Sequence, residues 1–410
     1  MLTNEIKTQF NEILEELGNN LDISETQYKY AVQSYQAVGN WLADEKSILS
    51  PYKPEILPQG SFLLGTMIKP VNDSDKLDVD LVCKLEGKKP EWTQYHLKKI
   101  VGDRLKDNKA YKEMLDEEGR RCWTLIYSDS SKYHMDILPS IVSEGHRVIL
   151  EKVFSSTDFK DFEKTAIRIT DNQEDNYYEE TNPDYWNKSN PFGYAAWFQE
   201  RCSISIQKSV FLSESVNPLP TYQKEKLPLQ RVVQILKRHR DIIFDGDDDM
   251  PISIIITTLS SKAYKKETDI TTALTNIVNT MESHIETKYS SEYGKWIKWI
   301  ANPVNEEENF ADKWVENPKK EQNFYKWINK VKSDLSSVYE LRGMHRIQES
   351  FSKSFGENLT KISFGNIADR AYQKREAGNL HMKLGSGILG SKVAGSTSVK
   401  SHSFHGKNKK

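Results

Sequence analysis

Two aspartates alternate with apolar residues in the segment LDVDLV, residues 77–82. Residues two apart in a strand point to the same face, so Asp78 and Asp80 would project together, away from the apolar face. Two like charges this close repel each other, and burying either one without a partner is costly. A bound cation would offset that repulsion, and the pattern therefore predicts a site for a divalent metal.

A third carboxylate, Asp136, lies on a later predicted strand in the segment YHMDILPS, residues 133–140. If this strand lies beside 77–83, the three carboxylates converge. Upstream, Gly60 and Ser61 precede a predicted helix, where glycine lets the backbone approach a phosphate and free N–H groups favour an anion. Such a set suits two Mg²⁺ ions and a nucleoside triphosphate, because Mg²⁺ takes carboxylate and phosphate oxygens.

Each of these features has an ordinary reading when it is taken alone. An Asp-x-Asp pair on a strand is usually a solvated edge, and most Gly-Ser pairs are turns. The order along the chain carries more information than any single member: Gly60-Ser61, a helix, Asp78-x-Asp80, and then Asp136 on another strand.

The composition predicts a soluble, reduced and cytoplasmic protein. The 410 residues have a formal net charge of −2, which argues against a general nucleic-acid coat or a polybasic membrane binder. The first residues are amphipathic and acidic, unlike a signal peptide, and the apolar runs are far shorter than a bilayer span. The three cysteines lack the spacing of a zinc site or a disulfide framework.

Hydrophobic periodicity predicts two N-terminal helices, the second of which starts near Ser24 with a capping box completed by Gln27. Residues 55 to about 150 are predicted to alternate between helices (after Gly60 and near 95–116) and strands (77–83, 121–128 and 133–138). A helical half follows, with helices at 227–244 and 251–264. Pro251 is expected at the first position of the second of these helices.

Three segments resemble the nucleotidyltransferases of the polymerase-β superfamily: PQGSFLLGT, LDVDLVC and YHMDILPS. Three later segments narrow the resemblance to the cGAS/DncV-like enzymes (CD-NTases), which make cyclic oligonucleotide signals in bacterial antiphage defence: SNPFGYAAWF, LQRVVQILKRHRD and MPISIIITTLSSKAY. A weaker similarity extends to NPVNEEENFADKW at 302–314. One departure is a long gap between Ser61 and Asp78, which indicates a bulkier loop.

The resemblance implies an α+β fold, with a polymerase-β-like core around a mixed sheet and a C-terminal helical domain, as two lobes around a cleft. The predicted parts are N-terminal helices packing on the core (1–50), the nucleotidyltransferase domain (51–215), an OAS-like helical domain (216–375) and a disordered basic tail (376–410). The tail is rich in glycine, serine and lysine and could not bury enough apolar surface to order itself.

The resemblance also implies roles for individual residues. Gln59, Gly60 and Ser61 would hold the triphosphate, and Asp78 and Asp80 would bind both metal ions. Asp136 would help to activate the attacking ribose hydroxyl and complete the metal ligands.

From the helical domain, Lys237 and Ser253 would contact nucleotide phosphates, although a lysine on a polar helix face is as often only solvated. Tyr194 or Phe192 could stack on a base, but core packing is the more ordinary use of either residue.

The implied reaction joins NTPs, with ATP and/or GTP as the expected substrates, into a cyclic di- or trinucleotide and releases pyrophosphate. It would use two Mg²⁺ ions, or Mn²⁺, and would need neither a nucleic acid nor a membrane. The C-terminal tail could be a substrate of ubiquitin-like conjugation machinery, although four residues follow Gly406. Two alternatives are a terminal nucleotidyltransferase acting on RNA or a small molecule, and a catalytically silent nucleotide sensor.

Overall fold

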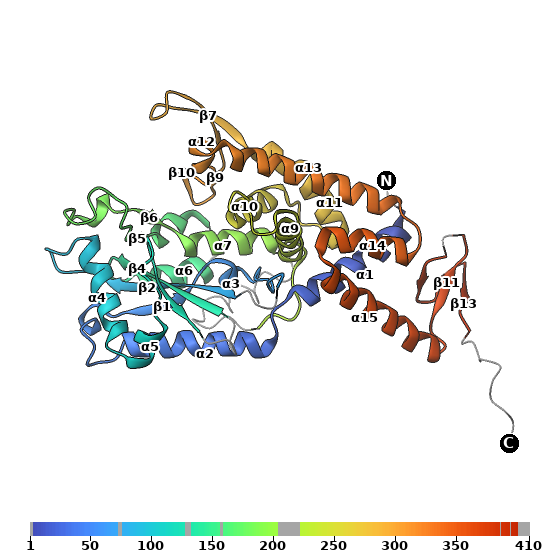
Figure 1. Cartoon of the computed structure of the whole chain (residues 1–410), viewed down its shortest axis with the longest axis horizontal. Helices are drawn as coiled ribbons and strands as arrows, with labels where there is room; N and C mark the ends of the chain where they lie inside the picture. Colours follow the sequence, from blue (N-terminus) through green and yellow to red (C-terminus); the bar gives the residue numbers. More distant parts are fainter. Residues whose placement is uncertain are drawn as a thin grey trace, which may run out of the picture.

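The computed structural model describes residues 3–72, 76–127, 133–155, 159–203, 222–385, 387–393 and 395–400. A part built around a sheet and a part built from helices lie side by side (Figure 1). One large hydrophobic cluster fills the helical part, and two smaller clusters cover the two faces of the sheet. The mixed α+β architecture that the sequence predicts is confirmed.

Six strands form the central sheet, in the order β1-β2-β4-β5-β6 with β3 paired to β4. The β2 and β4 strands are parallel, and the other pairs are antiparallel. Their bounds are Glu55–Pro58 (β1), Leu77–Glu86 (β2), Trp123–Ile126 (β3), Tyr133–Val142 (β4), Ile167–Ile169 (β5) and Lys188–Ser189 (β6). The three predicted strands at 77–83, 121–128 and 133–138 correspond to β2, β3 and β4.

Alternation along β2 separates its two faces. Leu77, Val79 and Leu81 are buried in one cluster together with residues of α2 (Glu25–Leu42) and α4 (Gln94–Lys106). Val82 packs on the other face, against residues of α6 (His146–Ser155) and α7 (Pro191–Cys202). Asp78 and Asp80 therefore lie on the same face as Val82 and α7.

The helical part is built around one central helix, α9 (Pro228–Phe244), whose residues are nearly all buried. The large cluster contains residues of all the longer helices around it: α10 (Ser253–Ala263), α11 (Ile270–Thr280), α13 (Pro318–Glu340), α14 (Met344–Phe355) and α15 (Glu357–Glu376). The remaining elements are α3 (Gly60–Leu64), α5 (Lys109–Met114), α12 (Lys313–Glu316), β7 (Glu286–Ser290), β8 (Lys295–Trp299), β9 (Ala301–Asn302) and β10 (Asn305–Asn309). The expected position of Pro251 is wrong, because Ile252 is the N-cap of α10 and the proline precedes it.

The two N-terminal helices belong to different parts of the molecule. The capping box of Ser24 and Gln27 is present at the start of α2, which packs on the sheet. In contrast, α1 (Asn4–Leu21) contributes its apolar side to the helical cluster. Arg231 of α9 secures α1 by donating to the Gly18 carbonyl and to the Asp22 carboxylate, both at 2.8 Å. Helix α1 thus packs with the helical part, and its last residue, Leu21, also accepts a hydrogen bond of 2.8 Å from the Lys69 amide.

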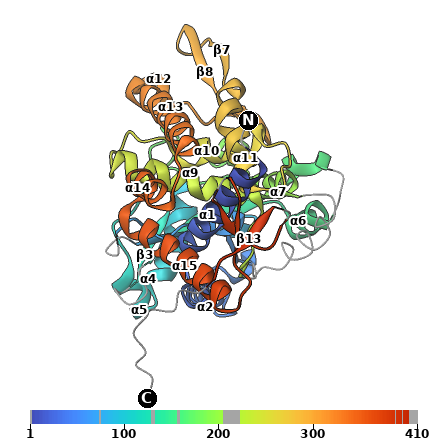
Figure 2. The same cartoon turned by 90° about the vertical axis from the view of Figure 1, so that its right-hand side faces the viewer.

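The segment after α15 differs from the predicted disordered tail. It contains a small sheet in the order β12-β11-β13, formed by His381–Lys383 (β11), Leu389–Gly390 (β12) and Ser396–Ser398 (β13). Lys383 forms an ion pair with Glu5, and Leu380 is buried, so this sheet is tied to the rest of the chain. Figure 2 shows it at the side of α15. Residues 401–410, including Gly406, lie outside the described residues.

Within the described ranges, no helix is both long and apolar enough to cross a membrane.

A close approach between α4 and β3 makes a first prediction possible. A Cβ added at Gly102 would lie 2.3 Å from Cζ2 of the buried Trp123 ring. Gly102→Ala should therefore lower the free energy of unfolding by about 1–3 kcal/mol, the usual cost of overpacking a core. Gly365→Ala is the matched control, because Gly365 is exposed within α15 with nothing within 4 Å of the added carbon. Urea denaturation of both variants checks this, and equal stability of the two would contradict the packing argument.

Candidate active site

The three aspartates predicted to act together lie on neighbouring parallel strands. In the register of β2 and β4, Asp80 lies opposite Asp136 and Asp78 lies opposite His134. Side chains paired in this way on adjacent strands are separated by about 5 Å at the backbone. The structure thus brings Asp78, Asp80 and Asp136 to one face of the sheet, as the alternation in the sequence predicts.

The negative charges of these carboxylates repel one another. Burial, followed by the charges of Asp136 and Asp78, raises the pKa of Asp80 to about 6. Burial and the charge of Asp136 also raise the pKa of Asp78, although solvent reaches its side chain. On β3, Thr124 donates a hydrogen bond of 2.6 Å to Asp136 Oδ1 and orients that carboxylate. In the conformation described here, no three His, Cys, Asp or Glu side chains of the described residues are arranged to hold a metal ion.

The turn at Gly60 lies directly against Asp80. The Gln59 amide donates to the Asp80 carbonyl at 2.8 Å, which continues the pairing of β1 with β2. Gly60 has φ of +59°, and a Cβ at this position would lie 2.3 Å from Asp80 Oδ2. Glycine is therefore required here for both its backbone conformation and its lack of a side chain. Ser61, the next residue, is half-buried in α3.

The polar face of α9 is buried against the segment that follows α3. Gln230 donates to the Leu64 carbonyl at 3.0 Å, and Gln234 donates to the Met67 carbonyl at 2.8 Å. Arg238 continues the series with a bond of 3.1 Å to the Pro70 carbonyl. None of these three residues is among the site residues predicted from the sequence. Their spacing of four residues, which places them on one face of a helix, was the available signal.

Lys237 belongs to the same buried face and is only 5% exposed, so the solvated reading of this lysine is wrong. Its Nζ donates to the Thr66 carbonyl at 3.2 Å, five residues after Ser61. Burial, followed by the charge of Arg240, lowers the pKa of Lys237 to about 8, while the charge of Asp80 acts in the opposite direction. Lys237 is therefore within electrostatic reach of the aspartates and is held beside the loop that follows the Gly60 turn.

The other predicted site residues are placed differently. Ser253 Oγ accepts a hydrogen bond of 2.9 Å from Arg240, which connects the start of α10 to α9. Tyr194 is buried, and its hydroxyl is 2.8 Å from Thr258 Oγ1. Phe192 packs in the cluster that contains Val82, on the same face of the sheet as the aspartates. Both aromatic rings thus serve core packing in this structure, which was the more ordinary of the two readings.

Comparison with known proteins agrees with this geometry. A family model described as "Cyclic GMP-AMP synthase DncV-like, nucleotidyltransferase domain" matches residues 54–139, which include β1, β2, β3 and most of β4. A c-di-GMP synthase of Roseivirga ehrenbergii is 28% identical over 392 residues, covering 95% of this chain and 93% of the relative. The cyclic dinucleotide synthase CdnG of Bradyrhizobium diazoefficiens is 20% identical over 390 residues, covering 89% of this chain and 86% of the relative.

Solved structures share the fold over nearly the whole chain. The CD-NTase CdnG of Bradyrhizobium diazoefficiens, in complex with GTP, aligns with a TM-score of 0.64 and 18% identity, covering 88% of this chain and 99% of that one. Escherichia coli DncV in its 3′-deoxy GTP-bound form aligns with a TM-score of 0.52 and 14% identity, covering 84% and 94% of the two chains.

The fold and the matched domain define this chain as a nucleotidyltransferase. Within that class, it is similar to the cGAS/DncV-like enzymes, the CD-NTases, and the resemblance noted in the sequence is confirmed.

The raised pKa of Asp80 generates a prediction for the metal-free protein. Because the pKa is about 6 in the folded state and 3.8 in an ordinary aspartate, the folded state binds more protons between these values. The free energy of unfolding should therefore fall as pH rises from about 4 to about 6. Asp80→Asn should reduce this decline, to which Asp78 also contributes, and stabilise the protein at pH 7 by about 1–3 kcal/mol.

Urea denaturation in EDTA, at several pH values between 4 and 7, measures the effect. Asp369→Asn, at an exposed position of α15, is the control and should retain the wild-type pH dependence. An Asp80→Asn protein that is less stable than wild type at pH 7 would show that the carboxylate is not under repulsion.

Proposed function

We propose that this chain is a cyclic dinucleotide synthase, which joins nucleoside triphosphates through phosphodiester bonds and releases pyrophosphate. The observation that supports it best is the placement of Asp80 opposite Asp136, directly against the Gly60 turn. The two relatives named above support it further, because both are cyclic dinucleotide synthases that align along most of their length. The substrates are ATP and/or GTP, and GTP is the first to test because one relative is a c-di-GMP synthase.

We infer that Asp78, Asp80 and Asp136 would hold two Mg²⁺ ions, or Mn²⁺. The site fits such ions, because burial and the charges of Asp136 and Asp78 raise the pKa of Asp80, a penalty that a bound cation would offset, and because Gly60 has no side chain to obstruct Asp80 Oδ2. When bound, such ions neutralise the carboxylates and stabilise charge on the attacking and leaving oxygens. Asp136, oriented by Thr124, would help to activate the ribose hydroxyl that attacks an α-phosphate.

The triphosphate would lie along the Gly60 turn. Backbone N–H groups at Gly60 and Ser61 would donate to phosphate oxygens, since no side chain obstructs the glycine. Lys237 could leave the Thr66 carbonyl for a phosphate oxygen, because a charged acceptor gives a stronger hydrogen bond than a carbonyl. Ser253 would act beside Arg240 at the start of α10.

The proposed setting is bacterial antiphage signalling in the cytoplasm, where the product would activate a defence effector. A connection between the tail and ubiquitin-like conjugation machinery stays a prediction from the sequence, because Gly406 lies outside the described residues.

Incubation with all four NTPs and Mg²⁺, followed by mass spectrometry, tests the reaction directly. The wild-type protein should yield a cyclic dinucleotide, and EDTA should abolish its formation. The combined change Asp78→Asn and Asp80→Asn should remove product while leaving the protein folded, and Asp136→Asn should be severely impaired. Asp369→Asn is the control for loss of an exposed carboxylate. Normal turnover in the double variant, or in thoroughly chelated wild type, would overturn the proposal.

A separate prediction concerns the lysine of α9. Lys237→Ala should weaken NTP binding by about 1–3 kcal/mol, the range for losing a charge-assisted hydrogen bond. Lys361→Ala, at an exposed position of α15, is the matched control and should bind NTPs like wild type. Calorimetric titration of both folded variants with GTP makes the comparison, and identical affinities would return Lys237 to a purely structural role at Thr66.

A further inference from the structure

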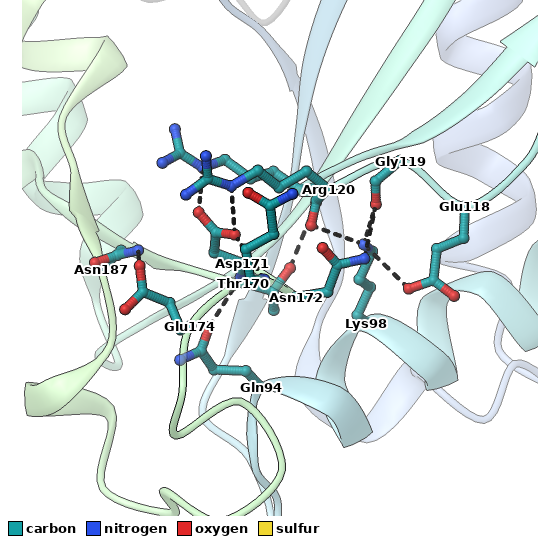
Figure 3. A network of polar contacts seen from close by, with 12 residues as sticks. Gln94, Lys98, Glu118, Gly119, Arg120, Thr170, Asp171, Asn172, Glu174 and Asn187 are labelled. Carbon is teal, nitrogen blue, oxygen red and sulfur yellow. Dashed lines mark hydrogen bonds and ion pairs between the residues drawn. The ribbon is translucent and has the colours of Figure 1, made fainter. Parts of the chain in front are cut away.

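Two adjacent arginines before β3 share one buried carboxylate. Arg120 Nε donates to Asp171 Oδ1 at 2.7 Å, and Arg121 Nε donates to Asp171 Oδ2 at 2.8 Å. The Asp171 side chain is fully buried, whereas those of Arg120 and Arg121 are 41% and 48% exposed. Each carboxylate oxygen of Asp171 accepts a hydrogen bond from the Nε of one arginine, which orients the two guanidinium groups (Figure 3).

A buried polar network holds Asp171 and the backbone that carries the two arginines. The Asp171 amide donates to Gln94 Oε1 at 2.8 Å. Lys98, also fully buried, donates to the Gly119 and Arg120 carbonyls and pairs with Glu118. Figure 3 shows these groups packed between α4 and the segment that precedes β3. Surface arginines are usually mobile and need no such support, so the network indicates that the position of this pair is functional.

The pair retains donors and charge that the network does not use. Asp171 balances only one of the two guanidinium charges, while the charges of Glu174 and Asp312 also act on Arg120 and that of Glu308 interacts with Arg121. In the part of the chain that the structure describes, the hydrogen bonds of both guanidinium groups come from Nε. A guanidinium fork of this kind matches the spacing of phosphate oxygens.

The pair lies between the aspartates and the helical part. In the register of β3 and β4, Thr124 lies opposite Asp136, and Arg121 precedes Thr124 by three residues. From the other side, the charge of Glu308 on β10 interacts with Arg121, and that of Asp312 interacts with Arg120. A molecule that extends from the aspartates toward β10 would therefore pass the outer nitrogens of the arginines.

We propose that Arg120 and Arg121 form a second phosphate-binding site, which holds the phosphates of the nucleotide whose triphosphate does not occupy the Gly60 turn. Asp171 is a positioning residue that orients both guanidinium groups, and Lys98 and Gln94 hold the backbone that carries them. This assignment rests on the proposed function, because only an enzyme that joins nucleotides has a second nucleotide to hold.

Calorimetric titration without metal tests the site with inorganic tripolyphosphate, which has no base. The double variant Arg120→Gln, Arg121→Gln should lose a component of binding or weaken it at least about 10-fold, as expected for lost charge-assisted hydrogen bonds. Arg342→Gln, at an exposed position between α13 and α14, is the control and should bind like wild type. Tripolyphosphate binding by the double variant that equals the control would overturn the site.

Two further variants separate charge from orientation. Asp171→Asn keeps both arginines and removes one negative charge. If charge alone matters, this variant should bind tripolyphosphate more tightly than the wild type. We expect weaker binding, because the arginines lose the carboxylate that orients them. Arg121→Lys preserves the positive charge but lacks the forked guanidinium group, so it should also bind tripolyphosphate more weakly. This single variant provides the test if the double variant does not fold. Wild-type affinity in both variants would contradict the positioning role.

Guanosine, which has no phosphate, distinguishes the phosphate from the base. Its binding should not depend on the arginines, and a loss in the double variant would overturn the phosphate assignment in favour of base recognition. The outcome is also separable from that of the proposed function. If tripolyphosphate binding depends on the arginines but the protein forms no cyclic product, only the proposed reaction is wrong. If the protein forms product but binding does not depend on the arginines, only this second phosphate site is wrong.

Discussion

The parallel pairing of β2 with β4 is the constraint on which the site depends. It sets Asp80 opposite Asp136, and strand alternation then adds Asp78 to the same face. The neighbouring strands complete the arrangement through the same two residues: β1 brings the Gly60 turn against Asp80, and β3 brings Thr124 to Asp136. A shift of one residue in this register would turn the aspartates into the apolar cluster below the sheet, where their desolvation would be prohibitive.

Helix α9 connects this sheet to the rest of the molecule by polar as well as apolar contacts. Its apolar residues are in the large helical cluster, while Gln230, Gln234 and Lys237 bind the backbone between Leu64 and Met67. A buried carbonyl without a donor is costly, so these side chains and the loop require each other. Any displacement of α9 relative to the sheet would therefore move the loop that begins at the Gly60 turn, which couples the helical part to the turn proposed to hold the triphosphate.

The sequence predicts those features that depend on local periodicity. The strand at Asp78, the capping box of α2 and the helix at 227–244 all follow from residue spacing, and each is present. Features that depend on tertiary contacts were not predictable in this way. The burial of Lys237 requires knowledge that the loop after α3 lies against α9, and the Arg121–Asp171 pair joins residues 50 positions apart. The strands after α15 are short and polar, and the sequence there reads as disordered.

The cations around the aspartates share a physical property that explains how the site can remain ready for a metal. Lys237 donates to Thr66 and the arginine pair donates to Asp171, so each has a partner other than the catalytic carboxylates. Had Lys237 formed an ion pair with Asp80, the negative charge there would be neutralised and the affinity for a divalent ion would fall. Because the carboxylates of Asp78, Asp80 and Asp136 instead repel one another, a cation entering the site gains the full attraction of all three. Under the proposals above, Lys237 and the arginine pair would then bind the phosphates that arrive with this cation.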